Sequence, residues 1–178
     1  NLTVPNYMQI SDKPILYDKI RIVYAGLLGF AQGVFNICKT IDFKSLDVEF
    51  HIYGDGVERK LIESYLSANP KSNIYIHKAL NKNDMQNKLL SYDATIIPLT
   101  KSIFGAFPSK ITMAMAAGLP IFFSGNGEGF KIVKEFELGY ASEAGNLDAL
   151  RENIKAFSKL NPQQINMIKS NIINVVKK

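Results

Sequence analysis

The sequence predicts an α/β fold, with helices on both faces of a doubly wound parallel sheet. Apolar strand-like segments alternate with helical segments six times, and several of the strand-like segments end in Gly or Pro. Alternation of this kind predicts a parallel sheet, because parallel neighbours need crossover connections. In such sheets ligands bind beyond the carboxyl ends of the strands, where the strand order reverses. Each loop that follows a strand is therefore a candidate site.

Six segments are expected to be strands because they are short, rich in β-branched or aromatic residues and bounded by turn residues. They are residues 19–26, 48–54, 73–79, 93–99, 119–124 and 139–142. Helical spacing or helix start signals mark seven further segments. These are residues 31–43, 57–67, 83–92, 108–117, 129–136, 146–160 and 162–178, the last with Pro162 at its start.

Length, charge and cysteine content limit the function classes. The 178 residues contain one cysteine, Cys38, which excludes an internal disulfide and offers no zinc cluster. No stretch approaches the roughly 18–20 apolar residues of a membrane span, and no signal peptide is recognisable. Because the chain starts at Asn1, we expect it to be part of a longer, cytoplasmic protein.

The net charge of +5 suits a phosphate-bearing ligand or an anionic membrane surface. The alternative is that it reflects only a soluble surface with surplus lysine. Nucleic acid is not an expected partner, because the chain has only three Arg and no stripe of Arg and aromatic residues.

Glycines in the first loop, residues 26–33 (GLLGFAQG), would let backbone approach a ligand closely. Leu28 occupies the second glycine position of G-x-G-x-x-G, so a dinucleotide site is only weakly indicated. A flexible strand-to-helix turn is the alternative. The second loop, YGDGVER (53–59), is typical of a tight turn with Asp55 capping the next helix. His77 and Lys78 open the third loop, and His51 lies within a predicted strand, so no metal-binding pair is evident.

The segment FGAFPSKITMAMAAGLP (104–120) is the most informative one. Pro108 at the first helical position leaves free backbone amides at Ser109 and Lys110, at the positive end of the helix dipole. The Ser109 hydroxyl and the Lys110 ammonium add a donor and a charge, which together predict an anion site. Gly118 and Pro120 would end the helix. Close helix–sheet packing is the alternative explanation for its small residues.

Four segments, in order, resemble the group 1 (family four) glycosyltransferases of the GT-B fold. AMAAGLPIFFS is similar to their E-A-M-A-x-G-x-P-V signature, FHIYGDGVERKLIESYL to their l-x-I-v-G-d-G-p-e-r-x-x-L segment, and KLLSYDATIIPL to their y-x-x-A-D-v-x-v-x-P segment. LTVPNYM resembles the connector between the two halves of these enzymes, and GAFPSK and AQG resemble a bacterial surface-polysaccharide (capsule-type) subgroup.

The resemblance implies a Rossmann-like fold, the C-terminal half of GT-B. Residues 1–19 would be the interdomain linker, 20–160 the nucleotide-sugar (donor) binding domain and 161–178 a C-terminal helix. It also implies a donor site whose base lies against the main chain of Ala79 and Leu80. The pyrophosphate would lie between the loop from Gly29 to Gly33 and the helix start at Pro108, Ser109 and Lys110.

Four positions depart from the family pattern. Met113 replaces a Glu that accepts hydrogen bonds from ribose hydroxyls, and Phe30 replaces an Arg that pairs with the pyrophosphate. Gln32 replaces a Lys, and Phe104 or Gly105 replaces the first Glu of a pair. Losing one charge-assisted hydrogen bond costs roughly 1.5–3 kcal/mol. Nearby lysines could compensate: Lys78, Lys82, Lys101 and Lys110.

The resemblance therefore implies the donor-binding domain of a hexosyltransferase-type enzyme. It would transfer a sugar from a nucleoside diphosphate sugar to a polysaccharide or lipid-linked acceptor, without a metal, with retention of configuration favoured. Its partners would be the absent N-terminal GT-B domain, with any catalytic base, and a membrane-associated acceptor at the inner membrane face. These 178 residues alone are expected to be inactive. The alternative is a non-catalytic GT-B-like module that has lost its ligand contacts.

Overall fold

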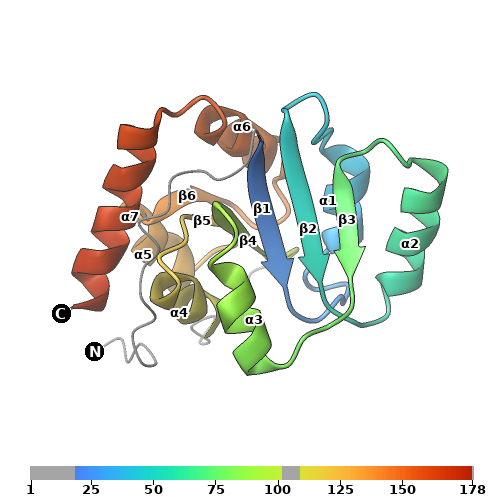
Figure 1. The fold of residues 1–178 in the computed structure, drawn as a ribbon, viewed down its shortest axis with the longest axis horizontal. Coiled ribbons are helices and arrows are strands. Elements are labelled where there is room, and N and C mark those ends of the chain that lie inside the picture. Colours follow the sequence, from blue (N-terminus) through green and yellow to red (C-terminus); the bar gives the residue numbers. More distant parts are fainter. Residues whose placement is uncertain (1–18, 102–108, 178) are drawn as a thin grey trace.

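The computed structural model describes residues 19–101 and 109–177, and in it six strands form one parallel sheet. The strands are β1 (Ile20–Ala25), β2 (Val48–Tyr53), β3 (Ile74–His77), β4 (Ala94–Pro98), β5 (Ile121–Ser124) and β6 (Gly139–Ser142). Their order across the sheet is β3-β2-β1-β4-β5-β6 (Figure 1). The parallel sheet that the alternating pattern predicts is confirmed, and the strand order reverses between β1 and β4.

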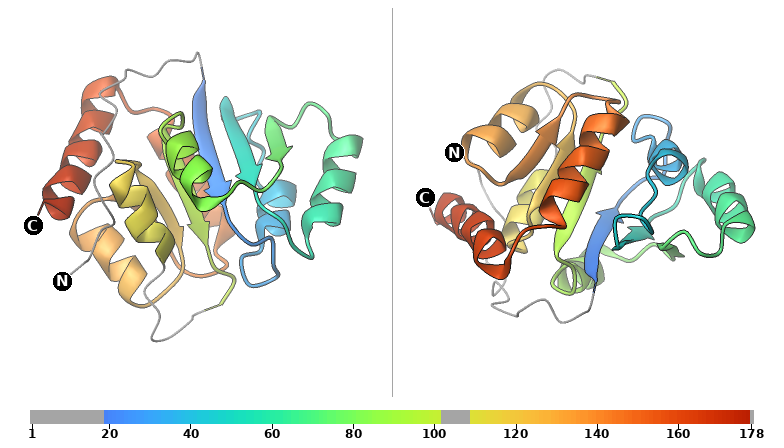
Figure 2. Two further views of the ribbon diagram at one scale, coloured as in Figure 1. Left: turned by 60° about the horizontal axis from the view of Figure 1, so that its bottom comes forward. Right: turned by 90° about the horizontal axis from the view of Figure 1, so that it is seen from above.

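Helices lie on both faces of this sheet (Figure 2). They are α1 (Val34–Thr40), α2 (Arg59–Ala68), α3 (Lys82–Leu89), α4 (Ser109–Ala116), α5 (Glu128–Glu135), α6 (Leu147–Phe157) and α7 (Pro162–Val176). Apolar side chains of α1, α2 and α6 share one buried cluster with Ile22 and Tyr24 of β1. Those of α3, α4, α5 and α7 share another with Val23. The alternation along β1 thus separates two cores, which confirms the doubly wound architecture.

Some expectations fall on residues outside the described ranges. These include the predicted linker, of which only residue 19 is described, and the predicted helix start at Pro108. Within the described ranges, no helix combines the length and the apolar content that crossing a bilayer requires.

Two histidines form a polar cluster on the sheet face of β2 and β3. His51 Nδ1 lies 3.0 Å from His77 Nε2, and His51 Nε2 lies 3.1 Å from Glu49 Oε2. Because a carboxylate only accepts, Nε2 of neutral His51 donates to Glu49, and Nδ1 then accepts from His77. Burial lowers the pKa of His51 to about 4, against the opposing effect of the Glu49 hydrogen bond. Burial also lowers the pKa of His77, with smaller contributions from the charges of Lys88 and Arg21.

We expect this cluster to make the chain less stable in mild acid. The pKa of His51 is lower in the folded state than the ordinary 6.5, so the unfolded chain binds protons first as the pH falls. The contribution of neutral His51 to the free energy of unfolding is complete above pH 6.5 and is lost as the pH falls towards 4. The loss amounts to about 2–3 kcal/mol. Denaturant titrations of the wild type and His51→Gln at several pH values measure it. Equal pH slopes for the two proteins would contradict the assignment.

Candidate functional site

A cleft of about 470 Å³ opens at the carboxyl edge of the sheet, next to the point where the strand order reverses. The loops after β1, β2 and β3 form its walls together with α3 and α4. Its lining residues are Ala25, Gly26, Leu27, Tyr53, Gly54, Asp55, Ala79, Leu80, Lys82, Met85, Ser109, Lys110 and Met113. The structure therefore brings five of the sequence-predicted site residues around one cavity: Ala79, Leu80, Ser109, Lys110 and Met113.

Lys110 places a cation in this cleft. Its Nζ lies 4.6 Å from the centre of the Tyr24 ring and donates to the Tyr24 hydroxyl at 3.2 Å. That hydroxyl in turn donates to the carbonyl of Leu27. A side chain at Gly26 would overlap Nζ, so the lysine packs directly against the loop after β1. The glycine at position 26, with φ of 148°, thus leaves room for the ammonium group.

The Lys110 side chain is partly buried, and its ammonium has no carboxylate beside it in the described part of the chain. Burial lowers the pKa of Lys110 to about 8. Burial also raises the pKa of Tyr24, and the nearby charge of Glu58 adds to this effect. A buried cation that faces a cavity and lacks a counter-ion is stabilised when an anion enters. The cleft is therefore suited to an anionic ligand.

The amino end of α4 reinforces this preference. Ser109 and Lys110 are the first two described residues of α4, and both line the cleft. Backbone amides in the first turn of a helix have no partner within the helix, and the helix dipole is positive there. Thr112 donates its hydroxyl hydrogen to the carbonyl of Ser109 at 2.7 Å.

The glycine loop of residues 29–33 does not line the cleft. Phe30 is 69% exposed, and Gly33 packs against Thr100, whose amide donates to the carbonyl of Ala31 at 2.8 Å. Gln32 folds over Gly29, and its buried Oε1 has no hydrogen-bond partner among the residues that the structure describes. The sequence-predicted residues of this loop therefore lie beside the end of β4 and not in the cleft: Gly29, Phe30, Gln32 and Gly33. Gly26 and Leu27, which precede them, line the cleft together with Lys110.

A carboxylate occupies the amino end of α1, directly after the glycine loop. Glu58 is 3% exposed, and its Oε2 accepts from the amide of Phe35 at 3.2 Å in the first turn of α1. A helix start of this kind attracts phosphate when it is free. In this chain the Glu58 carboxylate satisfies the amide and repels a second anion, so the start of α4 is the better anion site of the two.

Apolar residues form the opposite wall of the cleft, and two of them, Tyr53 and Met85, are not among the sequence-predicted site residues. Tyr53 and Met85 are 7% and 5% exposed, and with Leu80 and Met113 they form an apolar surface. Asp55 is the one carboxylate among the described lining residues, and its Oδ1 accepts from the amide of Gly56. It does not cap α2, which begins after Glu58. Lys82 adds a second cation at the start of α3.

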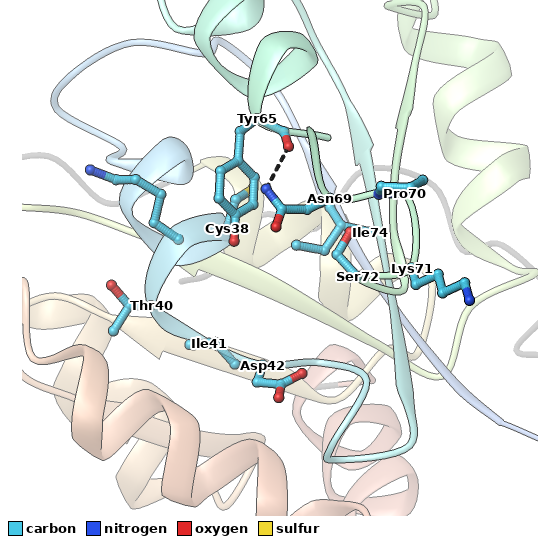
Figure 3. Close-up of a pocket in the computed structure, with 11 residues that line it drawn as sticks. Cys38, Thr40, Ile41, Asp42, Tyr65, Asn69, Pro70, Lys71, Ser72 and Ile74 are labelled. Carbon is cyan, nitrogen blue, oxygen red and sulfur yellow. Dashed lines mark hydrogen bonds between the residues drawn. The ribbon is translucent and has the colours of Figure 1, made fainter. Parts of the chain in front are cut away.

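A second cleft, of about 420 Å³, lies at the carboxyl ends of α1 and α2, where β3 begins (Figure 3). Its lining includes Cys38 and Tyr65, and the Asn69 side chain donates to the Tyr65 carbonyl at 2.9 Å. Burial and the charge of Glu58 raise the pKa of the Cys38 thiol to about 12, so it is no nucleophile. None of the sequence-predicted site residues lines this cleft.

The fold is similar to those of solved glycosyltransferase structures. WaaG, a glycosyltransferase involved in lipopolysaccharide biosynthesis, superposes with a TM-score of 0.69 at 15% identity, over 91% of this chain and 44% of WaaG. A variant of S. aureus TarM, in complex with fondaparinux, alpha-GlcNAc-glycerol and UDP, superposes with a TM-score of 0.71 at 20% identity, over 99% of this chain and 36% of TarM. The chain thus spans less than half the length of either protein.

A third similar structure is itself a C-terminal domain, that of the glycosyl transferase group 1 family protein LpcC from Francisella tularensis. It superposes with a TM-score of 0.71 at 18% identity, over 89% of this chain and 84% of that domain. This confirms the expected C-terminal half of a GT-B fold. A comparison with curated protein sequences gives no match. The family model described as "Glycosyl transferases group 1" matches residues 9–173, so the chain belongs to this glycosyltransferase family.

Proposed function

We propose that this chain is the donor-binding half of an enzyme that transfers a sugar from a nucleoside diphosphate sugar to a polysaccharide or lipid-linked acceptor. The observation that carries the proposal is the partly buried Lys110 ammonium, which faces the cleft without a carboxylate beside it among the described residues. Membership of the glycosyltransferase family supplies the reaction class. Similar structures solved in complex with UDP support a nucleotide as the ligand.

In this proposal the diphosphate binds Lys110 Nζ and the first amides of α4. The base would lie towards Ala79 and Leu80, which border the apolar wall. As the bond to the sugar breaks, negative charge develops on the diphosphate, and donors already in place stabilise that charge. We propose that these donors, rather than a metal, balance the charge, since Asp55 is the one carboxylate among the described lining residues. The acceptor and any catalytic base would belong to an N-terminal half.

Calorimetric titration of the chain with UDP, GDP and their sugars tests the proposal. We expect at least one of these nucleotides or nucleotide sugars to bind with a Kd of about 1 mM or lower. We expect EDTA to leave that affinity unchanged. The 178 residues alone should transfer no sugar. Absence of binding by every diphosphate would contradict the donor site, and a measurable transfer rate would contradict the division of roles between the halves.

A second candidate is a non-catalytic GT-B-like module, and the position of Met113 favours it. Met113 lies in the cleft wall, where its thioether accepts hydrogen bonds only weakly. If the chain is such a non-catalytic module, no nucleotide should bind at millimolar concentration, even after an N-terminal half is joined to it. Calorimetry with the nucleotides therefore separates the two candidates. Met113→Glu should raise nucleotide affinity if the cleft is the donor site, and no gain would contradict the placement of the site.

A further inference from the structure

We propose that Arg59 is a positioning residue of the donor site, one that holds two walls of the cleft in register without touching the ligand. This inference rests on the proposed function for its ligand. Arg59 is the first residue of α2 and is not among the residues that line the cleft. Its guanidinium group reaches back over the carboxyl ends of β2 and β3, which lie side by side in the sheet (Figure 1).

Arg59 Nη1 donates to two backbone carbonyls, that of Gly54 at 2.6 Å and that of His77 at 3.0 Å. The pairing of β2 with β3 ends at Tyr53 and His77, so the guanidinium joins the strands where the backbone ladder stops. Hydrogen bonds from a charged donor are stronger than neutral ones. The planar guanidinium suits two fixed acceptors, whereas a lysine ammonium is a point charge on a flexible stem.

Both carbonyls belong to the segments that build the cleft. Gly54 and Asp55 line one wall, and Ala79 and Leu80, two and three residues beyond His77, line another. A movement at Gly54 also reaches the lysine, because a Cβ at Gly54 would overlap the carbonyl of Gly26, and Gly26 packs against Lys110. Displacing the guanidinium therefore loosens the base side and the anion side of the cleft together.

The side chain of Arg59 is itself held. Its Nε pairs with Glu63 Oε1 at 2.8 Å, and the Arg59 side chain is 22% exposed. Arg151 on α6 provides a matched comparison, because it pairs with Asp148 at 3.1 Å and lies on a helix that contributes nothing to the cleft.

The test uses Arg59→Met, Arg59→Lys and the control Arg151→Met in the 178-residue chain. UDP affinity is measured by calorimetry. Exchange of the Gly26 and Leu28 amides, which donate to the carbonyls of Tyr53 and Asp55 in the cleft wall, is measured by NMR without ligand. We expect Arg59→Met to weaken UDP binding by about 10-fold or more and to speed exchange of these amides by about 10-fold. Arg59→Lys, which folds more readily, should lie in between, and Arg151→Met should stay within about 2-fold of the wild type.

Exchange rates in Arg59→Met that match the wild type would overturn the inference, and so would UDP binding within about 2-fold of the wild type. Failure of the wild type to bind any diphosphate would contradict the proposed function instead. The exchange rates of the ligand-free variants would still decide whether Arg59 positions these walls.

Discussion

A Lys110→Met variant should bind UDP about 10- to 100-fold more weakly than the wild type and should unfold at a higher temperature. The loss of affinity follows from one charge-assisted hydrogen bond to phosphate, worth roughly 1.5–3 kcal/mol. The gain in stability follows from burial, which lowers the pKa of Lys110 to about 8. At pH 7 the folded chain therefore holds a partly buried charge, and methionine removes it while keeping an apolar stem against Tyr24. Calorimetry and thermal unfolding measure the two effects.

Lys82→Met is the matched control for this variant, because Lys82 lines the same cleft from an exposed position at the start of α3. It should weaken UDP binding less and should leave the unfolding temperature nearly unchanged, since an exposed ammonium stays hydrated. If Lys110→Met raises the unfolding temperature and weakens UDP binding while Lys82→Met does not, then Lys110 favours ligand binding at the expense of stability. Wild-type UDP affinity in Lys110→Met would disprove the anion site.

Gly54→Ala should lower the free energy of unfolding by about 3 kcal/mol or more. The added Cβ would overlap the carbonyl of Gly26, and a backbone group cannot rotate aside as a side chain can. The loops after β1 and β2 are joined there by hydrogen bonds from the Gly26 amide to the Tyr53 carbonyl at 2.9 Å and from the Leu28 amide to the Asp55 carbonyl at 2.8 Å. The same change should weaken UDP binding, because Gly26 packs against Lys110.

Gly29→Ala tests whether the loss of stability in Gly54→Ala comes from the overlap with the Gly26 carbonyl. A Cβ at Gly29 would lie 2.9 Å from Gln32 Oε1, which is the end of a flexible side chain, and at ordinary van der Waals distance, 3.6 and 3.7 Å, from two atoms of Leu27. It should cost less than about 1 kcal/mol in chemical denaturation. Equal costs for the two alanines would mean that the loops after β1 and β2 are not packed backbone to backbone.

The elements follow from local signals, and their ends depend on distant contacts. The helix expected from residue 31 begins at Val34, because Gly33 adopts φ of 62° and residues 29–33 form a turn against Thr100. The strand expected to reach residue 79 ends at His77, because the guanidinium of Arg59 donates a hydrogen bond to the His77 carbonyl there. Neither Thr100 nor Arg59 is near its partner in the sequence. Periodicity alone therefore places an element correctly and leaves its end uncertain by a few residues.

Ser109 and Lys110, which line the cleft, can be recognised in the sequence because they stand together at a helix start and need no distant residue. On the apolar side, Leu80 and Met113 follow only from the family resemblance, and Tyr53 and Met85 cannot be found in this way. Tyr53 ends a buried strand and Met85 lies on the buried side of α3, so both have the pattern of core residues. The glycine spacing also could not reveal that Glu58, more than twenty residues later, occupies the start of α1.

A crystal structure of the chain with UDP bound tests the central claim most directly. We expect diphosphate oxygens within hydrogen-bond distance of Lys110 Nζ and of the first α4 amides, with the base beside Ala79 and Leu80. A diphosphate at the start of α1 instead, with the Glu58 carboxylate displaced from Phe35, would contradict the account. So would a cleft that stays empty at saturating UDP.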